Sequence, residues 1–465
     1  MAEQKYPPGI QAYIERGQQM AATEAKQRTL MRRKRFDTIA VHGIYGLEAT
    51  LAHQGSINEP AFLSSAQHFE NSDHMEAALA YLMPSWAYSR IANPTLHYLE
   101  ETLALLEGYG FPGEVSCCVT ASGMSAIFLA TNPFLVEEGQ GPINCVVSSK
   151  CYGGSFMLFN ERYAKERGID VRWVKDPLDL GEWENLVDEQ TRFLFGEMPS
   201  NPGLSVFDVC AVAQLAHQNG IPLIVDSTVA TPALLRPLCL GADIVVHSVS
   251  KSMNTGGLTI AGAVIARHQI LSLVGPDELK ENFALYLKLL PGRDFGPALN
   301  PLSALFVLND LHTLRSKMDL LSQNCLQVAL FLDQHSEVTA VYYPGLPADS
   351  GHVVASRLMR LVDCESDSDT VSQRYGHLLS FRVRGGAAAA RLFFDNLQMI
   401  LRATDLGRIK SIATIPAIST HQQQGEQGRS LADIPVDLVR LNVGGEHPED
   451  IIQDLDQALR GLRQS

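Results

Sequence analysis

Short apolar runs alternate with helix-like stretches from about residue 95, and this alternation limits the possible folds more than any other feature of the sequence. The apolar runs are Val115–Val119, Cys145–Val147, Val171–Val174, Phe193–Phe195, Leu223–Val225 and Ile244–Val246. Helical spacing of apolar residues is seen in Leu96–Leu106, Glu182–Gln190 and Cys210–Asn219. Because near-continuous apolar strands need cover on both faces, the pattern predicts an α/β fold with a mainly parallel sheet between two layers of helices.

The character of the sequence changes after residue 251, where strands and helices no longer alternate regularly. The elements expected there are strands within 257–266, one or two long helices over 302–335, a strand over 378–383 and a final amphipathic helix over 449–462. The first 50 or so residues are polar and helix-like, with an early break at Pro7-Pro8. We therefore divide the chain into an N-terminal extension and arm (1–86), a large domain (87–296) and a smaller C-terminal α+β domain (297–465).

Charge and cysteine usage narrow the class of protein. The sequence has 37 basic and 51 acidic residues, a net charge of −14 that does not favour a nucleic acid or an anionic membrane as a partner. None of its 8 cysteines forms a CxxC pair, and several lie in apolar runs, which is typical of free thiols in a reducing compartment. No apolar run approaches the roughly 18 residues of a membrane span. We expect a cytoplasmic protein.

Polar residues follow several of the apolar runs, where a parallel sheet carries its active site. Asp226 follows Leu223–Val225, and Ser248, Ser250 and Lys251 follow Ile244–Val246. Considered alone, Asp226 could simply cap the next helix, and Lys251 could be an ordinary surface lysine. Together they provide hydroxyls for an anion, an amine that can form an imine, and a carboxylate for a ring nitrogen, which are the requirements of pyridoxal 5'-phosphate (PLP). The sequence therefore predicts a PLP site with Lys251 as its Schiff-base lysine.

A third turn fits the same cofactor. Thr120 to Ser125 follows Val115–Val119 and contains Ser122-Gly123-Met124 at the predicted start of a helix. The free N–H groups and the positive dipole end of a helix N-terminus suit a phosphate. An ordinary strand–helix turn would have the same composition. The turn therefore supports a cofactor site only in combination with Asp226 and Lys251.

Six longer motifs carry a family resemblance. They are Tyr88-Ser89-Arg90-Ile91-Ala92-Asn93-Pro94-Thr95, Ala121-Ser122-Gly123-Met124, Glu197-Met198-Pro199-Ser200-Asn201-Pro202, Val225-Asp226-Ser227-Thr228-Val229-Ala230-Thr231-Pro232, Gly241-Ala242-Asp243-Ile244-Val245-Val246-His247-Ser248 and Val439-Arg440-Leu441-Asn442-Val443-Gly444. From about Phe36 to Leu462 the chain resembles the Cys/Met-metabolism group of PLP enzymes, which includes cystathionine γ-synthase, cystathionine lyases, methionine γ-lyase and O-acetylhomoserine sulfhydrylase. The resemblance implies PLP fold type I, which is aspartate-aminotransferase-like.

The resemblance also implies roles at the cofactor. Lys251 would hold PLP and move protons between substrate carbons, and Asp226 would pair with the ring nitrogen. Tyr152 would stack on the ring and act as a proton acceptor, while Asn201 would approach the ring hydroxyl. The phosphate would be bound by Ser248, Ser250 and the backbone of Gly123 and Met124, with Ser122 and Thr228 completing the cofactor-binding set.

Other implied roles concern the substrate and a second subunit. Arg440 would bind the α-carboxylate of a small amino-acid substrate through a bidentate pair. Tyr88 and Arg90 would reach the phosphate of a neighbouring subunit, and residues 1–86 would contact that subunit. The resemblance therefore implies a homodimer at least, with a homotetramer expected, and no metal site.

Three positions depart from the common family pattern. Ser250 stands where many members have threonine, and Ser227 stands where asparagine is usual. Asp405 stands where a serine or asparagine usually helps to place the substrate carboxylate. An aspartate there would repel that carboxylate unless it turns away or pairs with a cation, for which Arg408 and Lys410 are near in sequence. We expect Asp405 to influence substrate choice.

Two segments favour one reaction within the group. Tyr152-Gly153-Gly154 and the glycine-rich run Asn254–Gly262 resemble the sulfhydrylases, whereas methionine γ-lyases have cysteine in place of Gly154 and cystathionine γ-lyases have glutamate in place of Thr404. We therefore expect γ-replacement on an O-activated homoserine, with sulfide or another small nucleophile, giving homocysteine or a related amino acid. The alternatives are a PLP-dependent C–S lyase and a catalytically silent binding protein of the same fold.

Overall fold

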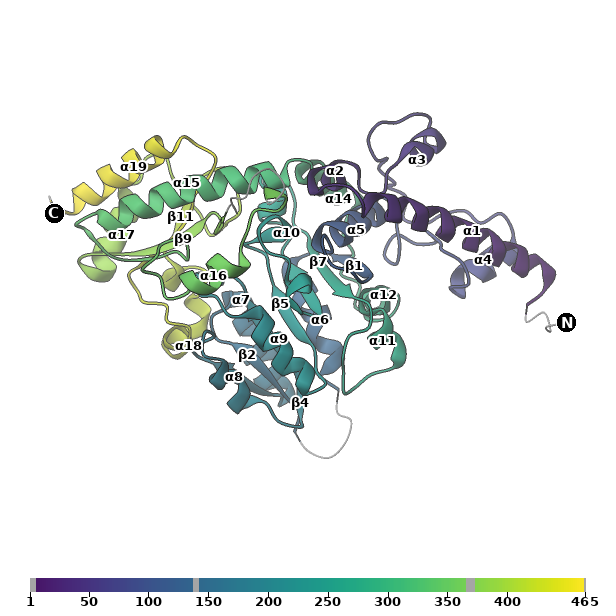
Figure 1. The fold of residues 1–465 in the computed structure, drawn as a ribbon, viewed down its shortest axis with the longest axis horizontal. Coiled ribbons are helices and arrows are strands. Elements are labelled where there is room, and N and C mark those ends of the chain that lie inside the picture. The colour runs from purple at the N-terminus through teal and green to yellow at the C-terminus, as the bar shows by residue number, and fades with distance from the viewer. Residues whose placement is uncertain (1–5, 137–141, 365–372, 464–465) are drawn as a thin grey trace.

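The computed structural model describes residues 6–136, 142–364 and 373–463, and its centre is a seven-stranded sheet (Figure 1). The strands are β1 (Val115–Thr120), β2 (Asn144–Ser148), β3 (Asp170–Val174), β4 (Thr191–Glu197), β5 (Leu223–Asp226), β6 (Ile244–His247) and β7 (Gly262–Arg267), in the order β1-β7-β6-β5-β4-β2-β3. All of the predicted apolar runs form strands. The sheet is mainly parallel as predicted, except that β7 runs antiparallel to both β1 and β6.

Both faces of this sheet are buried, which explains why its strands are apolar without interruption. Along β6, Val245 packs in one hydrophobic cluster while Ile244 and Val246 pack in a second cluster on the opposite face. Helices α5 (Pro94–Glu107), α8 (Leu180–Leu186) and α9 (Val209–Gln218) contribute to the first cluster, and α6 (Gly123–Thr131) and α12 (Phe283–Leu289) contribute to the second. Helix α8 ends at Leu186, four residues before the end expected from the sequence.

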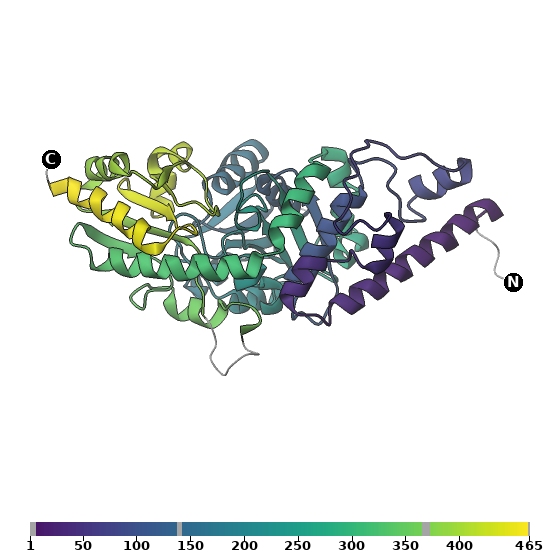
Figure 2. The ribbon, with the colours of Figure 1, turned by 90° about the horizontal axis from the view of Figure 1, so that it is seen from above.

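A second sheet lies in the C-terminal part. Its strands are β8 (Val338–Tyr342), β9 (Leu378–Val383), β10 (Leu401–Arg402), β11 (Ile412–Thr414) and β12 (Leu438–Asn442), in the order β10-β11-β12-β9-β8. The predicted helical stretch over 302–335 forms two helices, α14 (Pro301–Leu311) and α15 (Leu314–Gln334). Helix α15 packs against α19 (Pro448–Arg460) beside the second sheet (Figure 2). The inward face of α19 contains Ile451, Leu455, Ala458 and Leu459, a helical period.

The N-terminal helix α1 (Pro8–Met31) extends away from the body of the molecule with α3 (Leu47–Ala52) and α4 (Ser72–Leu79) (Figures 1 and 2). The predicted break at Pro7-Pro8 is in fact the start of α1, because proline is well tolerated in the first turn of a helix. Ion pairs of Arg28 with Glu101 and of Arg32 with Glu114 tie its C-terminal end to the body.

The remaining α-helices are short connectors and covers. They are α2 (Phe36–His42), α7 (Gly153–Met157), α10 (Thr231–Leu234), α11 (Asp277–Glu281), α13 (Pro291–Phe295), α16 (His352–Leu358), α17 (Gly386–Asn396) and α18 (Gly425–Leu431). Among the described residues, no helix combines the length and the apolar content that crossing a membrane requires.

Candidate active site

A cavity of about 470 Å³ opens where the carboxyl ends of β4, β5 and β6 meet the second sheet. The predicted site residues that line it are Ser122, Gly123, Met124, Tyr152, Asn201, Asp226, Thr228, Ser248, Ser250, Lys251, Asp405 and Arg440. It is also lined by Ile127, Glu197, Val229, Ile260, Thr404, Leu406 and Arg408. Strand ends bring most of the polar residues together, because parallel strands finish at one edge of the sheet.

Asp226 is the last residue of β5, and its carboxylate accepts hydrogen bonds from one residue, Thr228. Its Oδ1 accepts hydrogen bonds from the backbone N–H of Thr228 at 3.0 Å and from the Thr228 hydroxyl at 2.6 Å. Thr228 Oγ1 in turn accepts a hydrogen bond from the N–H of Ser248 at 2.7 Å, which links the ends of β5 and β6. Within the described parts of the chain, no hydrogen bond reaches Oδ2 of Asp226. Burial raises the pKa of Asp226, so a cation at this open oxygen would stabilise its charged form.

The N-terminus of α6 forms the opposite wall. Ser122 caps this helix, since its Oγ accepts a hydrogen bond from the N–H of Ser125 at 3.1 Å. The next residue, Gly123, approaches Ser248 so closely that an added Cβ would lie 2.6 Å from the Ser248 Cβ. Glycine is therefore needed to bring the first turn of α6 against Ser248. This concave, N–H-rich surface fits a phosphate group.

Ser250 lines the cavity, and its hydroxyl is hydrogen-bonded to the backbone of one residue, Ala261. Its Oγ donates to the carbonyl of Ala261 at 2.9 Å and accepts from the N–H of Ala261 at 2.9 Å. The single hydroxyl hydrogen is thus used within the protein, where it fixes the chain just before Lys251. The contact of the Ser250 hydroxyl with a phosphate stays a prediction.

Arg440 lies on β12 and is 1% exposed. Its Nη1 donates to Oδ1 of Asn201 at 2.8 Å, and its Nη2 donates to the carbonyl oxygen of Asp405 at 2.9 Å. Burial lowers the pKa of Arg440 to about 10, so the guanidinium stays charged at neutral pH. A buried, oriented guanidinium at the cavity wall is suited to a carboxylate.

The side chain of Asp405 faces the cavity and is paired there. Its Oδ1 lies 2.5 Å from Nζ of Lys251, and its Oδ2 accepts from Nε of Arg408 at 2.5 Å. Nη1 of Arg408 donates hydrogen bonds to the carbonyl oxygens of Ser250 at 2.6 Å and Asn254 at 2.7 Å. Burial acts to raise the pKa of Asp405, but Lys251 and Arg408 outweigh it and lower the pKa below its usual value. Of the two cations near it in sequence, Arg408 is its partner.

Glu197 is a residue of the cavity wall to which the sequence assigned no role. It is the last residue of β4, and its place just after an apolar run was the signal that could have found it. In the structure it is the register partner of Asp226 on β5. Its Oε2 accepts from the N–H of Tyr152 and its Oε1 accepts from the N–H of Asn201, both at 2.7 Å. The ring of Tyr152 meets His421 edge-on, with 6.3 Å between the ring centroids.

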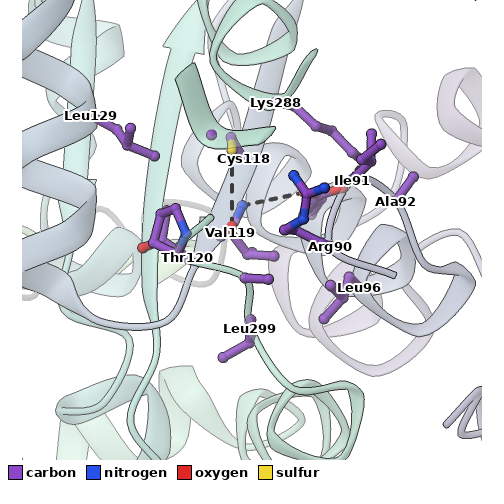
Figure 3. A pocket seen from close by; sticks show the side chains of 14 residues that line it. Arg90, Ile91, Ala92, Leu96, Cys118, Val119, Thr120, Leu129, Lys288 and Leu299 are labelled. Carbon is purple, nitrogen blue, oxygen red and sulfur yellow. Dashed lines mark hydrogen bonds and ion pairs between the residues drawn. The ribbon is translucent and has the colours of Figure 1, made fainter. Parts of the chain in front are cut away.

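Tyr88 and Arg90 do not join the other predicted site residues. Arg90 lies at a separate small cavity near Lys288 (Figure 3). Its guanidinium donates to the carbonyl of Arg293. Tyr88 is 45% exposed. Neither residue lines the cavity of its own chain, as expected for groups that serve a neighbouring subunit.

The residues of the cavity fit PLP in three independent ways. Asp226 lines the cavity with one carboxylate oxygen free of hydrogen bonds from the described residues, and the approach of Gly123 to Ser248 forms a cradle that a Cβ would fill. Lys251 places a primary amine in the wall between them. PLP needs a carboxylate for its ring nitrogen, a surface that binds its phosphate and an amine that can form an imine, and this one cavity contains all three.

Comparison with known proteins agrees with this fit. Residues 37–460 match the family described as Cys/Met metabolism PLP-dependent enzyme, so α1 lies outside the matched region. An O-acetyl-L-homoserine sulfhydrylase of Leptospira meyeri is 32% identical, with 92% of this chain and 97% of the relative covered. An L-methionine γ-lyase of Fusobacterium nucleatum subsp. polymorphum is 33% identical, with 90% and 99% covered.

A solved structure is similar in the same way. A Campylobacter jejuni protein described as an O-acetylhomoserine (thiol)-lyase superposes with a TM-score of 0.81 at 32% identity, over 92% of this chain and 100% of that one. It contains N'-pyridoxyl-lysine-5'-monophosphate, a lysine joined to the cofactor. At this identity and coverage, the similarity extends over nearly the whole fold.

Proposed function

This chain belongs to the Cys/Met-metabolism family of PLP-dependent enzymes, and on that premise we propose that it catalyses γ-replacement on an O-activated homoserine. The nucleophile would be sulfide or another small nucleophile, and the product homocysteine or a related amino acid. With O-acetylhomoserine and sulfide, the γ-carbon–oxygen bond breaks, acetate leaves with the bonding electrons, and a carbon–sulfur bond forms in its place.

The observation that carries this proposal is the pairing of Asp405. Cystathionine has a distal ammonium that needs a free acid, but Asp405 is already paired through its Oδ2 with Nε of Arg408. The adjacent Thr404 is neutral and lines the same cavity. A substrate whose distal end is uncharged, such as an acetyl ester, therefore matches this wall better than cystathionine does.

PLP supplies an electron sink when it is bound, and the residues of the chain supply positioning and proton transfer. Arg440, oriented by Asn201, would bind the α-carboxylate and so align the substrate Cα–H bond. Nζ of Lys251 would take the proton from Cα and return protons to the substrate carbons. Asp226 would keep the ring nitrogen protonated, and Tyr152 would cover the ring.

We also propose that the active unit is at least a homodimer, most consistently a homotetramer, in the cytoplasm. Tyr88 and Arg90 lie outside the cavity of their own chain, which supports a site shared between subunits. All 8 cysteines are free thiols, which favours a reducing compartment.

The test is incubation of the purified holoenzyme with O-acetylhomoserine, with and without sulfide. Homocysteine formed only with sulfide supports the proposal. Formation of 2-oxobutyrate and ammonia at the same rate in both samples would instead identify a C–S or C–O lyase, which the similarity to methionine γ-lyases favours as the second candidate. Neither product, in protein that lacks the visible band of bound PLP, would indicate a catalytically silent binding protein.

A further inference from the structure

Glu197 is a buried carboxylate that serves two backbone donors. It is 5% exposed, and each of its two oxygens accepts one N–H at 2.7 Å, from Tyr152 and from Asn201. Neither donor lies within a helix or strand, since Tyr152 is the residue before α7 and Asn201 lies in a turn. Among the described residues, Glu197 is the acceptor that satisfies each of these N–H groups.

The position of Glu197 is electrostatically unfavourable. In the parallel pairing of β4 and β5 it lies directly beside Asp226, so two carboxylates share one buried strand edge. Burial and the charge of Asp226 raise the pKa of Glu197 well above its usual range, although the two backbone donors and Arg440 oppose this. Burying a second acid here is costly, and the two hydrogen bonds that it accepts offset part of that cost.

The hydrogen bonds of Glu197 lead to both sides of the cavity. One bond fixes the backbone that carries the Tyr152 ring. The other fixes Asn201, whose side-chain oxygen accepts from Nη1 of Arg440 at 2.8 Å. We propose that Glu197 is a positioning residue, which sets Tyr152 and, through Asn201, orients the Arg440 guanidinium for the substrate carboxylate. This inference rests on the proposed function only in assigning the carboxylate to Arg440.

Two amines can measure this orientation without turnover. L-norvaline has the amino and carboxylate groups of a homoserine ester but no leaving group, whereas n-butylamine has no carboxylate. Both can be titrated against the visible absorption band of the bound cofactor in the holoenzyme. The ratio of their dissociation constants therefore reports the contribution of the carboxylate-binding arginine.

The variants are Glu197→Gln, which keeps the shape but removes one acceptor, and Glu197→Ala, which removes both. The matched control is Asp454→Asn, because Asp454 is 6% exposed and accepts three backbone N–H bonds, from Gln398, Met399 and Ile400, far from the cavity. All three changes remove a buried carboxylate that holds backbone, so they separate loss of stability from loss of orientation.

We expect Glu197→Gln to weaken L-norvaline binding by about tenfold, as for one lost hydrogen bond to a charged group, with n-butylamine binding little changed. Asp454→Asn should leave the ratio at the wild-type value. An unchanged ratio in Glu197→Gln would overturn the inference, as would an equal loss for both amines. If Glu197→Ala does not fold, the Gln variant still decides the question. Because no sulfide reaction is measured, failure of the proposed γ-replacement would leave this result unaffected.

Discussion

Nζ of Lys251 lies 2.5 Å from Oδ1 of Asp405, the residue for which the family resemblance implied a serine or asparagine. An unpaired aspartate about 4 Å from a substrate carboxylate would repel it by roughly 4 kcal/mol at an effective dielectric near 20. Arg408 removes this difficulty, because it holds the other oxygen of Asp405 at 2.5 Å. Asp405 therefore faces the site as half of an ion pair and not as a free charge.

Replacement of Asp405 should impair the enzyme, because it leaves Arg408 without its carboxylate partner at the cavity wall. We expect Asp405→Asn to lower kcat/KM for O-acetylhomoserine by roughly 10- to 100-fold, the cost of losing charged hydrogen bonds. The control is Asp310→Asn, which breaks a similar 2.5 Å ion pair with Lys317 outside the cavity. Unchanged kinetics in Asp405→Asn, or an equal loss in both variants, would contradict a role for this pair in catalysis.

Lys251 should be the residue that holds PLP. It is the lysine that lines the cavity, whereas Lys150 and Lys288 pair elsewhere with Asp433 and Glu100. Borohydride reduction of the holoenzyme followed by peptide mapping should find the pyridoxyl group on Lys251. The Lys251→Ala protein should carry no label, and a pyridoxyl group on another lysine of the wild type would disprove the assignment.

A site shared between subunits predicts complementation. Arg90→Ala and Lys251→Ala proteins should each be inactive, but a mixed dimer would contain one site with both residues intact. Partial activity should therefore return when the two proteins exchange subunits, up to about one quarter of wild type if they mix at random. Exchange can be followed by native mass spectrometry. Proven exchange without recovery would mean that Arg90 serves only its own chain.

Stability should fall in mild acid because His377 is buried in its neutral form. Its ring is 0% exposed and bonds to the Ser252 hydroxyl at 2.7 Å, and burial lowers its pKa to about 4. The unfolded chain, with a pKa near 6.5, binds the proton first as the pH falls, so stability is lost between about pH 6.5 and 4. The loss from this one group at pH 5 is about 2 kcal/mol.

Thermal unfolding at pH 7 and pH 5 tests this contribution. The decrease in Tm between the two conditions should be smaller in His377→Gln than in the wild type by about 2 °C, given the unfolding entropy of a chain of this length. His68→Gln provides the comparison, because His68 is exposed. The same decrease in all three proteins would show that His377 does not cause the acid sensitivity.

The strands were predictable because their signal is local. A buried parallel strand is an apolar run whatever its neighbours, so each run from Val115–Val119 to Ile244–Val246 could be recognised alone. Their order, and the reversed direction of β7, depend on which strands pair across long crossovers, which no single run encodes. The early end of α8 at Leu186 was also missed, since the helical spacing of apolar residues continues past it.

Site residues could be predicted where their signal lies in the adjacent sequence, but not where it depends on contacts made by the fold. Asp226 and Lys251 could be found because each directly follows an apolar run. Glu197 also ends a strand, but its partners Tyr152 and Asn201 donate backbone N–H groups, which have no residue-type signature. The choice of Arg408 over Lys410 as the partner of Asp405 likewise depended on side-chain direction, which sequence distance does not give.

The alternation of β6 between two hydrophobic clusters restricts how this gene can change in length. Deleting one residue within Ile244–His247 would exchange the side chains that the strand directs to its two buried faces, and the resulting change of register would move Lys251 out of the cavity. Selection should therefore remove insertions and deletions from this short segment, even at positions where amino-acid replacements are tolerated. A library of single-codon deletions selected for growth would be expected to show a gap there.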